Sequence, residues 1–298
     1  GDWSSDVCSS DLVGTHTPEI EAWTAVNPDS ELIPVARANG ITHSLVVPMG
    51  GTVSGISGLI ALSGWGIEEM AVKQKVALHL WWPGQGLSTH GNNKSGKSID
   101  EQVKDRNESV YKLDEFFNQA EAYIQSKANA PMNKTDFNPS WEAMPPFISG
   151  KMPIIIHADE KRQIISALDW AEKRKYNIII SGGRDAWKIA DRIASHNVPV
   201  IFRHVFTAPP QANLPFDTHF RAPGILANAG VELSIGLRLG AWSAANQRNL
   251  PYYAAHAIPL GLQRKDALAA VTINPAKLMG VQNQLGTLEK GKDATFIA

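Results

Sequence analysis

The sequence has 298 residues and a formal net charge of −1, with 43% hydrophobic and 19% charged residues. This length allows one large α/β domain with a sizeable core. The near-neutral charge argues against a general nucleic-acid or anionic-membrane binder, and no apolar run approaches the roughly 20 residues of a membrane helix, which favours a soluble protein.

The first twelve residues, GDWSSDVCSSDL, resemble one translated frame of a sequencing adapter. We interpret them as a non-native segment, with a disordered N-terminal arm as the alternative, and exclude them from the fold. Cys8, the only cysteine, lies in this segment, so cysteine usage says nothing about the redox compartment. The visible N-terminus also lacks the basic start and apolar stretch of a signal peptide, which leaves the localisation open.

The first predicted elements are a short helix at residues 31–38 and a strand at residues 41–47. Residues 48–58 are rich in glycine and are interpreted as a loop, either a simple connection or a backbone that approaches a ligand closely. A further strand is predicted at residues 76–81.

Residues 91–98, GNNKSGKS, match the G-x-x-x-x-G-K-S motif of phosphate-binding loops. Such a loop needs a buried strand that ends at its first glycine and a helix that follows its lysine. An amphipathic helix is predicted at residues 100–127, but the polar residues 85–90 precede Gly91 in place of a strand. A nucleotide-binding loop is therefore a minor alternative, and a surface connection is the favoured interpretation.

Two short apolar runs, Ile154–Ile156 and Ile178–Ile180, each end at a cluster of polar residues. A helical repeat of apolar residues lies between them, and a second one follows. Strands that are apolar on both faces and alternate with helices are typical of a parallel sheet covered by helices. Ligands bind such sheets beyond the carboxyl ends of the strands. The residues predicted at that edge are His157, Asp159, Ser181, Arg184 and Asp185.

The alternation continues with strands predicted at residues 198–202 and 231–235. Helices are predicted near residues 217–229, 252–260 and 265–273, and a turn and strand at residues 285–298. Arg203 and His204 follow the first of these strands, where they contact an acidic substrate or lie on the surface. Three further candidates for substrate contact, with cap or turn duty as the alternative for the asparagines, lie after the second strand: Asn246, Arg248 and Asn249.

Several segments resemble the amidohydrolase superfamily, in particular its imidazolonepropionase-like branch. They are residues 27–42, 156–159, 248–252, 272–280 and, most specifically, 285–294, LGTLEKGKDA. The resemblance covers nearly everything from Val13 onward. It implies an α/β fold: a TIM-type (β/α)8 barrel over residues 13–280, incomplete at its N-terminus, and the first part of a small composite β-sandwich at residues 281–298.

The resemblance also implies a chemistry, in which one or two divalent metals, zinc first among them, activate water to attack a carbon–nitrogen bond of a small molecule. The usual ligands are a His-x-His pair after the first strand, histidines after the fifth and sixth, and an aspartate after the eighth. Counted back from the tail, His157 matches the fifth-strand histidine, and Ser181 stands at the sixth-strand position. Residues 237–239, Leu-Arg-Leu, stand where the aspartate belongs, and the His-x-His pair has no counterpart.

One metal ligand is therefore recognisable, whereas zinc takes three or four, and Arg238 would repel a divalent cation. We predict a hydrolase of carbon–nitrogen bonds with most metal ligands missing or replaced. The alternative is a metal-poor barrel that binds a ligand or acts beside an active paralogue. For His157 the alternative is a hydrogen-bonded histidine that supports the site without contacting a metal or substrate. We further expect that the protein forms a homo-oligomer and that it is exported, as some relatives are. The candidate substrate contacts are Asp159, Ser181, Arg184, His204, Arg238, Asn246, Arg248 and Asn249. Without ligand spacing, His43, His79 and His90 are interpreted as structural.

Overall fold

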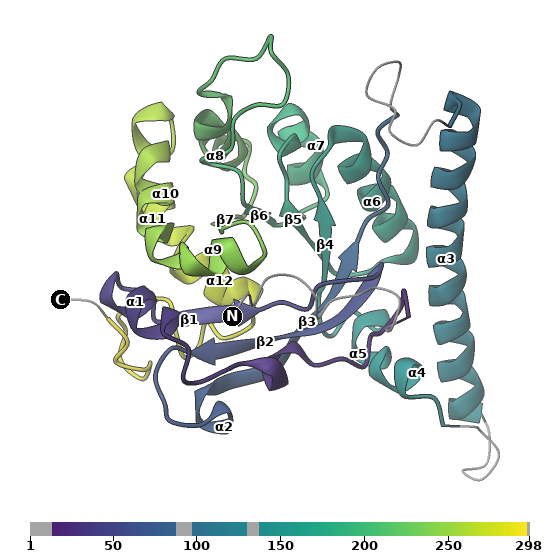
Figure 1. The fold of residues 1–298 in the computed structure, drawn as a ribbon, viewed down its shortest axis with the longest axis horizontal. Helices are drawn as coiled ribbons and strands as arrows, with labels where there is room; N and C mark the ends of the chain where they lie inside the picture. The colour runs from purple at the N-terminus through teal and green to yellow at the C-terminus, as the bar shows by residue number, and fades with distance from the viewer. Residues whose placement is uncertain (1–13, 88–96, 130–136, 297–298) are drawn as a thin grey trace, which may run out of the picture.

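The computed structural model describes residues 14–87, 97–129 and 137–296. Its centre is a seven-stranded sheet in which each strand pairs with the next along the chain. The sheet curls into half a barrel (Figure 1). The first three strands pair antiparallel, and the third to the seventh pair parallel. The strands are β1 (His43–Val46), β2 (Val53–Ala61), β3 (Ala71–Trp81), β4 (Ile154–Ala158), β5 (Ile178–Gly182), β6 (Val200–Phe202) and β7 (Leu233–Ile235).

Helices follow the parallel strands and surround the outside of the curl (Figure 1). The α-helices are α1 (Leu32–Ala38), α2 (Ile67–Met70), α3 (Ile99–Asn129), α4 (Pro139–Ala143), α5 (Pro145–Ile148), α6 (Lys161–Arg174), α7 (Ala190–Ser195), α8 (Thr218–Asn228), α9 (Ala241–Ala245), α10 (Leu250–Ala257), α11 (Arg264–Ala269) and α12 (Ile273–Leu278). Four 3-10 turns are η1 (Ala22–Ala25), η2 (Ala186–Ile189), η3 (Gln247–Asn249) and η4 (Ile258–Leu260). The predicted incomplete α/β barrel is confirmed.

The isoleucine runs of β4 and β5 explain how the sheet is covered on both faces. Ile154 and Ile178 belong to the large core cluster with α3, α6, α7 and α8. Ile155 and Ile179, one position on, pack on the inner face against α12. Because successive side chains of a strand point to opposite faces, uninterrupted isoleucine is what such a doubly covered strand requires.

The prediction of a loop at residues 48–58 is wrong for its second half, because β2 occupies residues 53–61. The reason is a crossing segment, residues 16–21, which pairs with β2 through isolated bridges. At Gly55, with a φ of +122°, a Cβ would lie 2.5 Å from the Ile20 carbonyl oxygen, and at Gly58 it would lie 2.6 Å from the Trp23 Cβ. These glycines therefore permit backbone approach within the chain and do not show a ligand loop.

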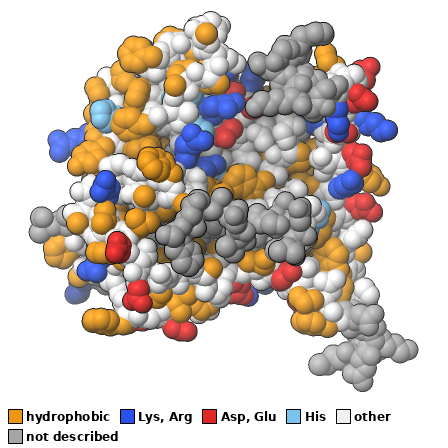
Figure 2. All heavy atoms as spheres, viewed as in Figure 1, with side chains coloured by type: hydrophobic (Ala, Val, Ile, Leu, Met, Phe, Trp, Pro, Cys, Tyr) orange, Lys and Arg blue, Asp and Glu red, His pale blue; other side chains and the backbone are white. Residues whose placement is uncertain are grey.

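Basic side chains are unevenly placed on the face shown in Figure 2, where Lys and Arg gather near the middle, above the ends of β5 to β7. In the described ranges, no helix combines the length and the apolar content needed to cross a bilayer.

The described tail, up to residue 296, contains turns after α12 and no strand. The composite β-sandwich, and with it the boundary at residue 281, stays a prediction.

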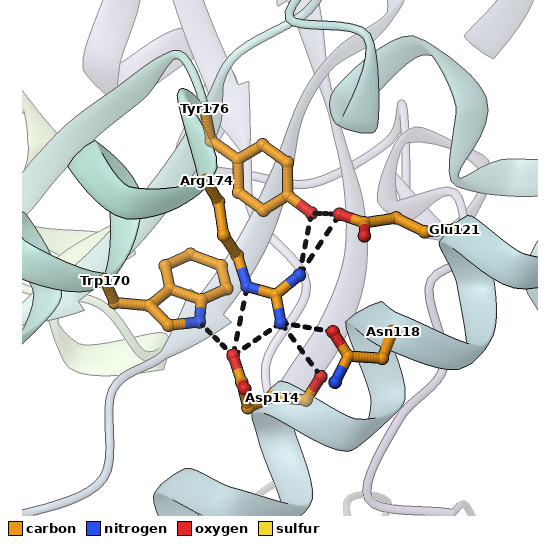
Figure 3. Close-up of polar contacts among 6 residues, drawn as sticks. All are labelled: Asp114, Asn118, Glu121, Trp170, Arg174 and Tyr176. Atoms are coloured by element: carbon orange, nitrogen blue, oxygen red, sulfur yellow. Dashed lines mark hydrogen bonds and ion pairs between the residues drawn. The ribbon is translucent and has the colours of Figure 1, made fainter.

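A polar cluster fixes the long helix α3 to the end of α6 (Figure 3). The Arg174 guanidinium donates through Nε to Asp114 Oδ1 at 3.0 Å and through Nη1 to Glu121 Oε1 at 3.1 Å. Trp170 Nε1 donates to the same Asp114 oxygen at 3.1 Å, and the Tyr176 hydroxyl donates to Glu121. Burial, followed by the Glu121 contact, raises the pKa of Tyr176, so its hydroxyl stays a donor. The charged and polar side chains between α3 and α6 thus find their hydrogen-bond partners within the fold.

Candidate functional site

A cavity of about 600 Å³ lies on the inner face of the half-barrel. Its wall combines the carboxyl ends of the parallel strands with α1, β1 and the loop of residues 236–250. The side chains that face inward at these strand ends include His79, His157, Ser181, Arg203 and Ser234. The cavity thus occupies the edge at which the sequence predicted ligand binding.

Two histidines from neighbouring strands form the most buried polar pair of this wall. His79 Nδ1 lies 2.9 Å from His157 Nε2, and the His157 ring stacks on Trp81 with centroids 4.1 Å apart. His79 is 1% exposed and His157 is 4% exposed. His79 Nε2 and His157 Nδ1 are enclosed and have no hydrogen-bond partner among the residues that the structure describes. The interpretation of His79 as merely structural therefore missed a partner that β3–β4 pairing supplies.

The two histidines are held neutral by their surroundings. Burial, followed by the positive charge of Arg203, lowers the pKa of His79 to about 3. Burial also holds the pKa of His157 well below its usual value, with His79 and Arg203 as further causes. A neutral pair shares one proton between the facing nitrogens, so its outer nitrogens are one donor and one acceptor, whichever tautomers are present.

Asp159 and His204, both predicted as substrate contacts, meet each other at the rim. His204 Nε2 lies 2.7 Å from Asp159 Oδ1. Burial opposes the Asp159 charge, but His204 as hydrogen-bond and charge partner lowers the pKa of the carboxyl below its ordinary value. His204 is 6% exposed and Arg203 is 8% exposed. The surface alternative for Arg203 and His204 is therefore wrong.

The other predicted contacts separate into two groups. Ser181 lies opposite His157 in the β4–β5 register, and Arg238 lies at the cavity mouth, exposed. Arg184 Nη2 lies 3.7 Å from Glu160 Oε1, outside the cavity wall. The remaining three make local or distant chain contacts: Asn246 Nδ2 donates to the Trp242 carbonyl, Asn249 Nδ2 to Asn246 Oδ1, and Asn39 Nδ2 to the Arg248 carbonyl. Their role in substrate binding stays a prediction.

Comparison with protein families matches residues 71–298 to the amidohydrolase family. The chain belongs to the amidohydrolase family. This confirms the predicted superfamily and makes the chain a hydrolase by kinship; the imidazolonepropionase-like branch is compatible with the match and stays a prediction. Comparison with curated proteins finds no match.

Solved structures agree with the family at the level of the fold. The chain is 24% identical to an amidohydrolase from Thermotoga maritima MSB8, with a TM-score of 0.81, covering 99% of this chain and 75% of that one. A prolidase complexed with N-methylphosphonate-L-proline is 20% identical, with a TM-score of 0.38 over 55% of this chain and 42% of that one. An adenosine deaminase from Xanthomonas campestris with bound zinc is 19% identical, with a TM-score of 0.37 over 61% and 47%. Only the first likeness is high enough to indicate a shared fold.

Members of this family generally depend on a metal, and a metal centre requires several ligand side chains close together. The described residues contain no group of three or more His, Cys, Asp or Glu side chains that could hold a metal ion. His79 and His157 direct two ring nitrogens toward each other, but zinc takes three or four protein ligands. The cation of Arg203, which disfavours protonation of both histidines, would also repel zinc. The described residues by themselves do not fit the metal centre.

Three features singled out in the sequence lie wholly or partly outside the described residues. Residues 1–12 with Cys8, and also His90, are outside them, as is most of the phosphate-loop motif. Of that motif, Lys97 Nζ lies 2.5 Å from Asp105 Oδ2, and the Ser98 and Glu101 side chains cap the start of α3. β3 ends at Trp81, well before Gly91, so the strand that a phosphate loop requires does not lead into it.

Proposed function

We propose that the protein hydrolyses a carbon–nitrogen bond in a small molecule, such as a cyclic amide or a dipeptide-like compound, and that the inner cavity is its substrate site. The observation that carries this proposal is the His79–His157 pair in the cavity wall, at the strand edge where barrel enzymes work. Its outer donor and acceptor are enclosed by the wall, so a polarised amide or an attacking water would bind them only when the wall opens.

The roles of this chain's own residues follow from their neighbours. The neutral histidines would orient the reacting group through the outer donor and the outer acceptor of the pair. Asp159 fixes the His204 ring at the rim through the 2.7 Å contact. The described residues do not provide a site for the divalent metal, zinc by preference, that the family resemblance implies.

The test is turnover of a panel of cyclic amides and dipeptides by the purified chain and its His157→Asn variant. We expect hydrolysis by the parent and at least a hundredfold slower turnover by the variant, as for loss of a group that handles the proton. His196→Asn, at the end of α7 and remote from the cavity, is the matched control and should keep the parent rate. No turnover by the parent, or equal turnover by His157→Asn, would contradict the proposal.

A second candidate is a metal-poor barrel that binds a ligand without catalysis and acts alone, as a homo-oligomer or beside an active paralogue. The lack of a three-ligand cluster among the described side chains supports it. Metal content after zinc-replete expression separates the two, since about one tightly held equivalent favours the enzyme and none favours the binder. Ser181→His with Arg238→Asp should raise zinc affinity, because two ligands are added and a repelling charge is removed.

A further inference from the structure

Arg203 is a buried cation that contacts no counter-ion in the described part of the chain. It lies at the inner face just beyond β6 and lines the cavity, with 8% of its surface exposed. Across residues 14–87, 97–129 and 137–296, no side chain or carbonyl hydrogen-bonds its guanidinium, and no carboxylate lies within 4.0 Å. Its Nε is fully enclosed and has no partner within those ranges.

The nearest acidic group does not neutralise it by contact. Asp159 lies on the other side of Gly182: a Cβ built on this glycine would overlap Asp159 Oδ1 and lie 3.1 Å from Arg203 Nη2. The same Asp159 oxygen is engaged by His204 at 2.7 Å. Asp159 therefore attracts Arg203 only through space, and burial remains the first cause that lowers the pKa of the Arg203 guanidinium.

The described wall of the cavity is positive as a whole. Arg203 and Arg238 line it, no Asp or Glu does, and Arg238 also lacks a salt bridge to any described carboxylate. After burial, the positive charge of Arg238 also lowers the pKa of the Arg203 guanidinium.

A buried charge costs several kcal/mol unless it is paired, and a guanidinium presents a fork of donors that matches a carboxylate or phosphate. We infer that the cavity binds a small organic anion, with its carboxylate or phosphate on Arg203, Arg238 at the mouth, and an apolar body inside. This inference rests on the cavity of the proposed function and names its substrate class. The aliphatic part of the wall includes Ile60, Leu62, Ile155, Ile201 and Leu250.

The test is calorimetric titration of the whole chain, treated with a chelator, with four probes. They are 3-phenylpropionate, phenyl phosphate, inorganic phosphate and the neutral amide 3-phenylpropionamide. We expect an organic anion to bind at least about tenfold more tightly than the amide, as for a charge-assisted hydrogen bond. Tighter binding of phenylpropionate identifies a carboxylate ligand, and tighter binding of phenyl phosphate identifies a phosphate ligand.

Variants assign this preference to the two arginines. Arg203→Gln should lose the preference for anions, and Arg238→Gln, an exposed change that spares the fold, should lose part of it. Arg264→Gln removes the same charge from an exposed position at the start of α11, outside the cavity wall, and should bind like the parent. Saturable binding is measured without turnover or metal, so a failed hydrolysis assay leaves this test intact.

Three results would overturn the inference. One is equal affinity for 3-phenylpropionate and its amide, or no saturable binding of any probe in the millimolar range. Another is full anion preference in Arg238→Gln and in a folded Arg203→Gln. If only inorganic phosphate binds, and Arg264→Gln weakens it equally, the contact is nonspecific and the inference is wrong.

Discussion

Two arginines of this protein are similarly enclosed and are treated in opposite ways by the fold. The Arg174 side chain is 11% exposed and reaches Asp114, Asn118 and Glu121 on α3 (Figure 3). Arg203 is 8% exposed, and its guanidinium hydrogen-bonds to none of the described residues. Because the fold compensates one charge and leaves the other open, Arg174 serves stability and Arg203 serves a ligand.

The strongest test of the stabilising side is Arg174→Met. We expect a loss of about 3 kcal/mol in the free energy of unfolding, near the low end for breaking a buried ion pair, because both carboxylates are about a third exposed and water compensates them in part. Urea denaturation measures it. Arg192→Met, which breaks an exposed pair with Asp169, is the control and should change stability by no more than about 0.5 kcal/mol. Equal losses would show that the α3–α6 cluster is an ordinary surface contact.

Gly182→Ala tests the wall between Asp159 and Arg203. Gly182 has a φ of +106°, and a Cβ there would overlap Asp159 Oδ1, so we expect a loss of about 2 kcal/mol from strain and displacement. Gly150, with a φ of +72° and open space around it, is the matched control. Gly150→Ala should cost only about 1 kcal/mol. A smaller loss at Gly182 than at Gly150 would rule out this tight wall.

The histidine pair should make the stability of the folded protein depend on pH in the acidic range. The folded protein holds the pKa of His79 at about 3, whereas a free histidine titrates near 6.5. Below pH 6.5 the unfolded chain binds a proton that the folded chain does not, so stability falls between pH 6.5 and about 3. In chelator-treated protein we expect His79 alone to contribute a loss of about 1 kcal/mol from pH 6.5 to 5.5, measured as the difference between the parent and His79→Asn. His79→Asn should flatten this slope, and an unchanged slope would exclude the pair as its source.

The parts of the fold that the sequence predicted are those fixed by local pattern. The isoleucine runs of β4 and β5 and the helices α3 and α6 were expected because each carries its own apolar pattern. β2 was missed because Gly55 and Gly58 weaken the strand signal. The reason for each glycine is a close contact with a distant part of the chain: Ile20 lies against Gly55, and Trp23 lies against Gly58.

The candidate site divides in the same way. His157, Asp159 and Ser181 were placed at the carboxyl edge because each directly follows or ends an apolar run. His79 was not, although it shares the inner-face parity of Ala77 and Trp81, because its partner depends on the pairing of β3 with β4 across 78 positions of sequence. The burial of Arg203 could not be read locally either, since the loop and strand that enclose it are remote in the chain.

The most direct test of the contrast between the two arginines is the unfolding free energy of Arg203→Met, measured by urea denaturation with and without 3-phenylpropionate. Without ligand we expect no loss, or a gain of about 1 kcal/mol, because an uncompensated buried charge is replaced by an apolar side chain. The anion should stabilise the parent by mass action and leave the variant unchanged. A loss as large as that of Arg174→Met, with equal stabilisation of parent and variant by the anion, would show that Arg203 supports the fold and not a ligand.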